Sequence, residues 1–345
     1  MPRVGNGTPA ACALHNRVFF PILSGTESRQ MTQAMITMRR EFESEMRVAM
    51  TLNRFTAISA LFASLWLALP ASAQVLPEAQ IGVRIPLAKK PTTRPMGVAY
   101  SPLHQRYFVA DGGLGPVPGS MDITTSRSEV HVFDASGKYL QSALPGLDNR
   151  AIYFNPNTKL IETITYNVSS SAGFTPGTGI YSLEINDKGE LTENTRDIIS
   201  FNPAFGDAAT MPSYDAKTQR YYAKQERSNR VWVVDPKQRE KVSEIVLDLD
   251  AAGARFDDIS DHFIAYTGIA GEELAVLDVD HKAVLVFDLN GKLVGKSALP
   301  PTLKLLSQNH YNGVGYSNGM VFVYAEREGE FGTYLGFKVS DQVAP

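Results

Sequence analysis

The segment Glu129–Pro145, EVHVFDASGKYLQSALP, has the pattern of a strand, a tight turn and a second strand. A similar segment returns near the C-terminus as Ala283–Pro300, AVLVFDLNGKLVGKSALP. In both copies an Asp follows the first strand, and a Gly three residues later supplies the left-handed backbone position that such a turn needs. Two distant copies of one hairpin indicate a repeat architecture.

Short apolar or alternating runs, separated by turn residues, fill the chain after Gln74, and long helical periodicity is nearly absent. These runs fall into sets of four. The sets are 97–101, 106–111, 129–134 and 139–144; 151–155, 160–167, 179–185 and 190–198; 211–215, 220–226, 230–235 and 242–249; and 263–267, 273–279, 283–289 and 293–299. A fifth set has only three runs, 313–317, 320–326 and 333–340.

The segment Ile81–Lys89 resembles the strand that the fifth set lacks. Pairing of Ile81–Lys89 with Thr333–Ser340 would complete that set and remove an exposed sheet edge. The sequence therefore predicts an all-β fold, a β-propeller of five four-stranded blades closed by its N-terminal strand. A sixth, degenerate blade within 190–212 or 298–314 is an alternative count.

A two-sheet sandwich is the structural rival, but twenty strands are many for that architecture. A tyrosine recurs in the first strand of each set, which favours radial repetition. We expect these rings to pack between neighbouring blades. They are Tyr100, Tyr153, Tyr214, Tyr266 and Tyr316.

The first set, GVAYSPLHQRYFVAD (97–111) followed by EVHVFDASGKYL (129–140), resembles one blade of the NHL-type β-propeller repeat. RVWVVDP (230–236) and AVLVFDLNGKL (283–293) are similar to the later part of the same unit. YVTN and gluconolactonase-like propellers share this strand pattern. The resemblance implies a binding platform, in some members an enzyme, and it implies no particular catalytic residue.

The N-terminal region has the features of a secretory signal. Arg54 precedes the apolar run Phe55–Leu69, and Ala71-Ser72-Ala73 forms a cleavage site. We expect an upstream extension over 1–49, a signal peptide over 50–73 cleaved after Ala73, and the propeller over 74–345. The mature protein would be periplasmic or secreted, the alternative being an uncleaved membrane anchor. The only cysteine, Cys12, precedes the signal, so a disulfide is excluded after cleavage.

Residues 1–73 carry seven of the 33 basic and four of the 36 acidic residues, which leaves residues 74–345 with a net charge of −6. This balance argues against nucleic acid and anionic membranes as partners. We expect a monomer that binds a protein or a small polar ligand.

In a propeller, the loops that enter the first strands and the loops between second and third strands open on one face. Polar residues of these loops are the predicted ligand-binding set: Arg94, Asp111, Asn149, Arg150, Asn167, Asp207, Glu226, Asp258, His262, Asn309, His310 and Glu326. Four of them, Asn149, Asp207, Asp258 and Asn309, offer the oxygen donors that Ca²⁺ prefers. Ordinary solvated loops are the competing interpretation.

No H-E-x-x-H or EF-hand spacing occurs. A binding module is therefore the leading functional hypothesis. The alternative is a gluconolactonase-like, Ca²⁺-assisted lactonase or esterase. His262 and His310 could serve as a base or a ligand near neutral pH. A sugar-cleaving enzyme would need two carboxylates among Asp207, Glu226 and Asp258. The other strand and turn histidines, His104, His131 and His281, receive no role, and 112–128 is interpreted as a lid over the funnel.

Overall fold

The computed structural model describes residue 40 and residues 74–90, 94–115, 127–145, 147–170, 173–199, 205–207, 210–326 and 328–342. For residues 94, 112–115, 127, 147–148, 166–170 and 173–178 it describes the backbone alone. The predicted extension and signal peptide therefore lie outside the described residues, apart from Arg40, and so does most of the predicted lid.

Three antiparallel sheets follow one another along the chain, each with its four strands in sequence order. The first consists of β2 (Arg94–Ser101), β3 (Arg106–Gly115), β4 (Arg127–Asp134) and β5 (Tyr139–Ala143). The second consists of β6 (Leu147–Asn155), β7 (Leu160–Ser170), β8 (Gly173–Ile185) and β9 (Leu191–Ile199). The third consists of β10 (Ser213–Asp215), β11 (Arg220–Lys224), β12 (Arg230–Asp235) and β13 (Glu240–Val246).

The remaining strands form one eight-stranded sheet in the order β14-β15-β16-β17-β1-β20-β19-β18. Their bounds are β14 (Ala265–Tyr266), β15 (Leu274–Asp278), β16 (Ala283–Phe287), β17 (Leu293–Ala298), β1 (Val75–Pro86), β20 (Thr333–Ser340), β19 (Met320–Ala325) and β18 (Gly315–Ser317). β1 pairs antiparallel with β20, with Ile85 opposite Tyr334, and meets β17 in parallel at Glu78 and Ala298. The predicted pairing of the N-terminal strand with Thr333–Ser340 is thus present, although that strand begins earlier, at Val75, and ends at Pro86.

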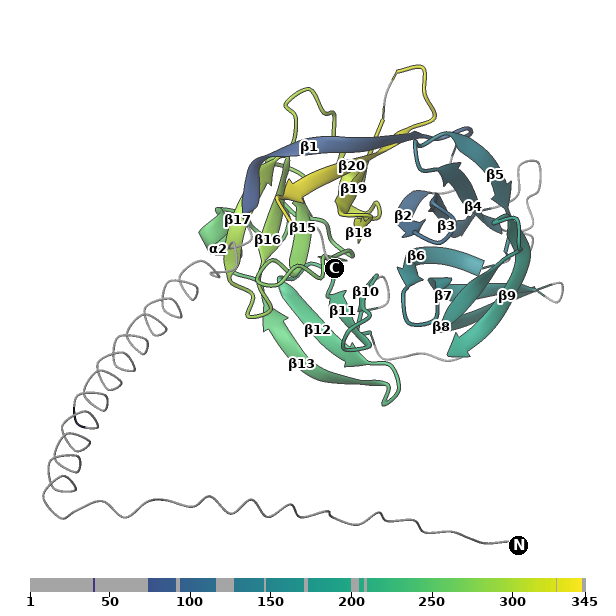
Figure 1. The fold of residues 1–345 in the computed structure, drawn as a ribbon, viewed down its shortest axis with the longest axis horizontal. Helices are drawn as coiled ribbons and strands as arrows, with labels where there is room; N and C mark the ends of the chain where they lie inside the picture. Colours follow the sequence, from purple (N-terminus) through teal and green to yellow (C-terminus); the bar gives the residue numbers. More distant parts are fainter. Residues whose placement is uncertain are drawn as a thin grey trace, which may run out of the picture. The chain divides into compact units, whose positions relative to one another are not determined.

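The first strands of the sets, β2, β6, β10, β14 and β18, lie on the inside (Figure 1). Contacts between them run in a cycle from β2 to β6, β10, β14, β18 and back to β2. A cavity of about 40 Å³ lies among these strands and their entry segments, lined from all five by residues such as Val98, Ile152, Ser213, Ile264 and Tyr316. The all-β prediction is confirmed, and the sheets have the arrangement of a propeller-type fold.

Three of the recurring tyrosines, Tyr153, Tyr214 and Tyr266, contact rings of a neighbouring sheet, as predicted. The Tyr153 and Tyr214 ring centroids lie 5.0 Å apart, and Tyr222 stacks on Tyr266 at 4.9 Å. The hydroxyl groups of Tyr153 and Tyr221 also form a hydrogen bond, with the two oxygens 2.6 Å apart. Aromatic and β-branched side chains thus fill the spaces between sheets, which is the role that burial of large rings favours.

The repeated Asx residues form the turns that the sequence predicts. Asp134 Oδ1 accepts from the backbone N–H groups of Ser136 and Lys138, and Gly137 adopts φ +86°. Asp288 and Gly291 repeat this arrangement between β16 and β17. An L side chain at Gly137 would meet the Arg84 carbonyl oxygen at 2.0 Å, so the turn fits β1 only with glycine.

One predicted strand ends early. The pattern over 242–249 predicts a strand, but β13 ends at Val246 and a short helix, α2 (Leu249–Ala252), begins instead. Asp248 is the reason, because its carboxylate accepts from the Ala251 N–H and caps the helix. A 3₁₀ turn, η2 (Ser307–His310), precedes β18. In the part of the chain that the structure describes, helices are too short to cross a membrane.

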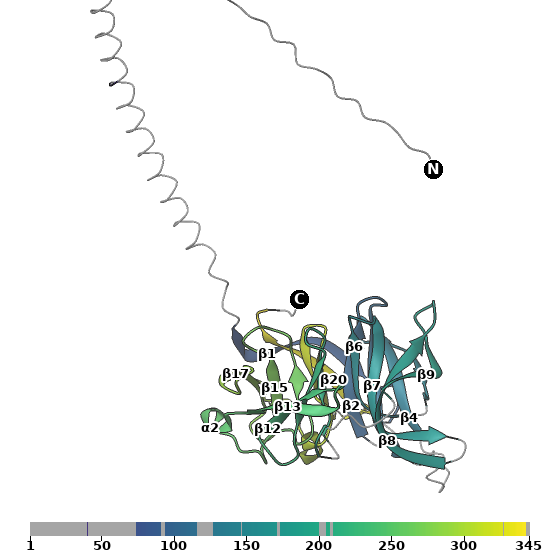
Figure 2. The ribbon, with the colours of Figure 1, turned by 90° about the horizontal axis from the view of Figure 1, so that it is seen from below.

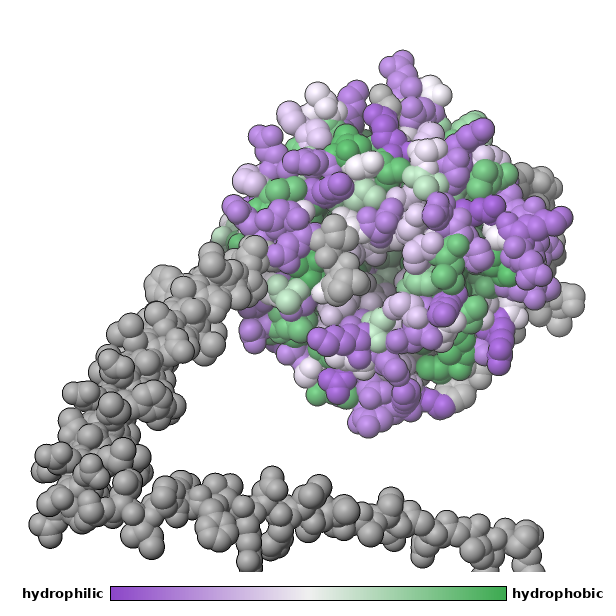
Figure 3. All heavy atoms as spheres, in the orientation of Figure 1, coloured by the Kyte–Doolittle hydropathy of each residue, from purple (hydrophilic) through white to green (hydrophobic). Residues whose placement is uncertain are grey.

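Figure 2 shows that the end of β20 and the far ends of β7 and β8 lie on opposite faces of the sheets. The face seen in Figure 3, on which β20 ends, mixes hydrophilic and hydrophobic residues without one broad apolar area. The opposite face is the one on which the inner strands begin and the second strands end, and we call it the loop face.

Candidate functional site on the loop face

Hydrogen bonds between successive sheets connect the segments of the loop face. The Asn149 N–H and side-chain amide donate to Ser128 Oγ, and Lys224 Nζ donates to the Asp261 carbonyl. Asp261 N donates to the His310 carbonyl, and Gly313 N donates to the Pro95 carbonyl. These bonds fix the positions of the polar residues on this face relative to one another, so candidate sites here are held by the sheets.

The first polar group is the Asp111 cluster, which consists of Asp111, Glu129 and His131. Asp111 on β3 stands directly opposite Glu129 on β4, and His131 follows two residues later on the same side of the sheet. The three are 2 %, 9 % and 2 % exposed. One ligand atom from each lies within 4.8 Å of the others, and His131 Nε2 is 3.8 Å from Asp111 Oδ2.

Neighbouring side chains orient this cluster. His131 Nδ1 lies 2.8 Å from Ser142 Oγ, which lies 2.9 Å from the Tyr139 hydroxyl. Lys89 Nζ donates to Glu129 Oε1 at 2.6 Å. Ser128 Oγ donates to the Asp111 carbonyl and so connects the cluster to Asn149. Because Ser142 occupies Nδ1, the second ring nitrogen of His131 faces the two carboxylates.

A pocket of about 370 Å³ opens beside the Asp111 cluster. Its lining is Lys90, Pro95, Leu306, Gln308, Asn309, Asn312, Tyr324, Glu326, Glu330 and Phe331. Leu306 and Phe331 are 41 % and 54 % exposed and give it an apolar rim. Asn312 is 2 % exposed, and its Oδ1 has no hydrogen-bond partner among the described residues. The pocket therefore combines amide groups, charges and apolar surface.

The pocket and the cluster are adjacent. Pro95, in the pocket wall, pairs with Asp111 across β2 and β3. Burial raises the pKa of Tyr324, and the charges of Glu326 and Asp111 raise it further. Burial likewise raises the pKa of Tyr334 well above its ordinary value, again with the Asp111 charge contributing, and its hydroxyl donates to the Met96 carbonyl. Both phenols thus stay protonated at neutral pH.

The second polar group is the Lys224 cluster, which consists of Lys224, Gln225, Asp207, Asp261 and His310. Lys224 is fully buried, and its Nζ donates to the carbonyls of Asp261 and Gln225 at 2.8 and 3.3 Å. Burial lowers its pKa to about 8, against a smaller opposing effect of the Asp261 and Glu226 charges. A second pocket of about 370 Å³ lies here, lined by Arg227, Phe256, Asp257, Ile259, Asp261, His310 and Tyr311.

Most carboxylates near the Lys224 cluster hold loop backbone. Asp207 accepts from the Glu226 N–H, and Asp261 accepts from the Arg227 N–H. Asp258 accepts from both the backbone and the guanidinium of Arg255, and these bonds lower its pKa. Such contacts stabilise turns, which is the ordinary use of Asp in loops.

The structure brings together some of the predicted ligand-binding residues. Asn309 and Glu326 line the first pocket, and Asp111 lies next to it. Asp207 contacts Glu226, while His310 Nδ1 and Nε2 contact the Ile259 carbonyl and Asp280. His262 packs 5.6 Å from the Tyr311 ring. Arg150 lines the central cavity.

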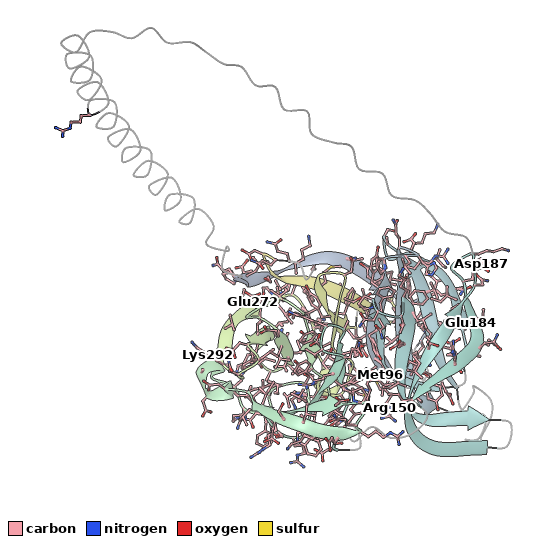
Figure 4. The ribbon with its side chains drawn as sticks, turned by 60° about the horizontal axis from the view of Figure 1, so that its bottom comes forward. Met96, Arg150, Glu184, Asp187, Glu272 and Lys292 are labelled. Atoms are coloured by element: carbon pink, nitrogen blue, oxygen red, sulfur yellow. The ribbon has the colours of Figure 1, made fainter. Side chains whose placement is uncertain are left out.

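Figure 4 shows Arg150 and Met96 towards the middle, and Glu184 and Lys292 at the rim.

Two predicted residues, Arg94 and Asn167, are described by their backbone alone, within β2 and β7. The four predicted Ca²⁺ ligands have different partners, which are Ser128 for Asn149, Glu226 for Asp207, Arg255 for Asp258, and Tyr324 for Asn309. The Ca²⁺ site at these four residues stays a prediction.

Glu129, His131, Asn312 and Lys224 are not among the residues predicted from the sequence. The alternation Glu129-x-His131 places two polar side chains on one side of a buried strand. Strands buried on both faces are ordinarily apolar throughout, so this alternation was the available signal. Lys224 gave a similar signal within the run RYYAK.

No family model matches the chain, and no curated protein matches it in sequence. Solved structures resemble it at low identity. Glutaminyl cyclase from Myxococcus xanthus is 11 % identical with a TM-score of 0.43, over 76 % of this chain and 97 % of that one. A chain of the nidogen/laminin complex is 18 % identical with a TM-score of 0.32, over 59 % and 63 %.

The PQQ-bound aldose sugar dehydrogenase from Streptomyces coelicolor is 13 % identical with a TM-score of 0.33, over 73 % of this chain and 81 % of that one. These proteins are propeller-like. Because identities are below 20 % and TM-scores below 0.5, no ligand or activity follows from them. The resemblance to NHL repeats stays a prediction.

Proposed function

We propose that the protein binds a small polar ligand, one with hydroxyl or amide N–H groups, in the pocket beside the Asp111 cluster. The observation that carries this proposal is Asn312 Oδ1, a buried acceptor with no hydrogen-bond partner among the described residues, in a residue that lines the pocket. An unsatisfied buried acceptor costs about 1–3 kcal/mol, and a donor from a ligand would offset that cost.

The rest of the pocket supports the same ligand class. Gln308 and Lys90 add hydrogen-bonding groups, while Leu306 and Phe331 expose apolar surface at the mouth. Sites for small ligands typically combine apolar walls with a few polar groups that fix orientation. Carbohydrates and short peptides both present N–H or O–H donors next to apolar surface, so they are the ligand classes to test.

The platform for this site is a closed propeller of five blades. The cyclic contacts of the inner strands, the cavity lined from all five, and the pairing of β1 with β20 support this count. An experimental structure in which β1 leaves β20 would contradict it. We also place the mature protein outside the cytoplasm, on the strength of the Arg54–Ala73 signal. N-terminal sequencing of the mature protein from its host should begin at Gln74, and an intact Met1 would contradict export.

Binding can be tested with a glycan array and a set of dipeptides, confirmed by saturation-transfer NMR. Phe331→Ala and Asn312→Ala should each lower the affinity for any compound that binds the wild-type protein at least tenfold. Phe256→Ala is the matched control, because Phe256 is an exposed aromatic residue, 41 % exposed, at the other pocket. Absence of binding across both sets, or equal weakening by all three variants, would contradict the proposal.

A metal-assisted lactone or ester hydrolase is the second candidate function. The buried Asp111 cluster beside the pocket favours it, because a metal there could polarise a carbonyl group. Turnover of lactones or p-nitrophenyl esters by the metal-loaded chain, lost in Glu129→Gln, would support this candidate. Absence of turnover in the metal-loaded chain would rule it out for these substrates.

A further inference from the structure

We propose that Asp111, Glu129 and His131 bind one divalent transition-metal ion, of which Zn²⁺ fits the donor set best. β3 and β4 hold Asp111 and Glu129 directly opposite each other, and His131 adds a ring nitrogen on the same side. Opposed strand positions have Cβ atoms roughly 5 Å apart, so these side chains converge without help from a loop.

The distances suit a common ligand. The donor atoms of the three residues all lie within 4.8 Å of one another, and the Asp111–His131 pair is 3.8 Å apart. Two donors on one Zn²⁺ ion, each about 2.1 Å from it, are roughly 3.4 Å apart in tetrahedral geometry. Side-chain movements of at most about 1.4 Å therefore bring the donor atoms to that spacing. Three protein ligands leave a further coordination position, as in zinc sites that take a water molecule or a substrate.

His131 provides the independent evidence. It is 2 % exposed, and its Nε2 faces the carboxylates without a hydrogen-bond partner among the described residues. Its other nitrogen lies 2.8 Å from Ser142 Oγ. A metal-binding histidine ordinarily donates its second N–H to such a partner, which fixes the ring and leaves the opposite lone pair for the metal. A bare ion pair with Asp111 would place Nε2 closer than 3.8 Å.

Charge favours a cation at this point. Two carboxylates from opposed strand positions repel each other when buried. Lys89 pairs with Glu129 from a side chain that is 47 % exposed, so it can move into solvent when an ion binds. One imidazole and two carboxylates suit Zn²⁺ or Mn²⁺, whereas Ca²⁺ takes six to eight oxygen ligands. This site is distinct from the predicted Ca²⁺ ligands.

The test uses the full chain without a histidine tag, freed of metal with EDTA, in competition with a chromophoric chelator. We expect one Zn²⁺ per chain, bound at least 100-fold more tightly than Ca²⁺. Glu129→Gln and His131→Asn should each lower the affinity for Zn²⁺ at least tenfold. His281→Asn is the matched control, because His281 contacts Asp278 at 3.0 Å but sits in an exposed turn.

A second readout does not depend on how the variants fold. In the wild-type chain, long-range ¹H–¹⁵N NMR should show one equivalent of Zn²⁺ shifting the Nε2 resonance of His131. Zinc binding that leaves this resonance unchanged, or that is equal in Glu129→Gln and wild type, would overturn the proposal. The outcome is independent of the Asn312 pocket, whose failure to bind glycans or dipeptides would leave the zinc result intact.

Discussion

The two copies of the hairpin that define the repeat differ at the positions that matter for chemistry. In the first copy Asp111 faces Glu129, with His131 two residues further on; in the second, Asp278 faces Ala283, with Leu285 two residues further on. Ala283 and Leu285 are buried core residues, 7 % and 0 % exposed. The fold is the same with either set, so the polar residues of the first copy are not required by the fold.

Asp278 is a buried carboxylate whose neighbours on the facing strand are apolar. It accepts from the His281 N–H and lies 3.0 Å from that ring. Burial raises its pKa, and the His281 contacts oppose that effect. Its function is to close the β15–β16 turn. One backbone position thus holds a turn residue in one sheet and a candidate metal ligand in another.

The largest effect should come from copying the first hairpin into the second. Leu285→His places a polar ring where apolar side chains surround it, without the Ser142 and Asp111 partners that His131 has. We expect a loss of about 3–4 kcal/mol in the free energy of unfolding, measured by urea denaturation. A loss below about 1 kcal/mol would mean that the position tolerates polarity and that His131 needs no special account.

A third sheet has a fully buried lysine at the corresponding strand position. Lys224 on β11 lies opposite Val231, as Ala110 on β3 lies opposite Val130. The pKa of Lys224, lowered by burial to about 8, lies below the ordinary value of 10.5. Between these values the unfolded chain holds the extra proton. Stability therefore rises with pH across this range, by up to about 3 kcal/mol.

Unfolding by urea at pH 7.5, 8.5 and 9.5 measures this rise. Lys224→Met should lack it and gives the reference that removes the contribution of tyrosine titration. Equal pH dependence in the two proteins would show that the Lys224 ammonium is not desolvated as the structure indicates.

The smallest effect on stability should come from the reverse exchange. The double variant Glu129→Ala, His131→Leu gives the first hairpin the residues of the second. We expect a change within about 1 kcal/mol in metal-free protein, because the loss of the part-exposed Lys89 pair is offset by removal of carboxylate repulsion. A loss above about 3 kcal/mol in the free energy of unfolding would mean that these polar residues are needed for the stability of the core.

The fold was predictable because alternation and turn residues are local signals that recur at each repeat. Glu129–Pro145 and Ala283–Pro300 alone predict paired strands joined by Asx turns, and both are confirmed. The pairing of β1 with β20 was also predictable, because the last set contains only three runs and lacks a fourth strand.

The site was less predictable because it depends on which strand residues face a neighbouring sheet. Asp111 is among the predicted loop residues but Glu129 and His131 are not, since sequence position does not show which buried side chains meet. Asp207 and Asp258 are also predicted ligands, but their oxygens accept from nearby backbone N–H groups. Loop carboxylates are often used in this way by the loop itself.

The most direct test of the account is a crystal structure of the full chain soaked in Zn²⁺, with data collected on both sides of the zinc absorption edge. We predict one strong anomalous peak in contact with Asp111, Glu129 and His131, and no peak at Asp278. A peak at Asp207 or Asp258 with none at His131, or no ordered peak at all, would contradict it.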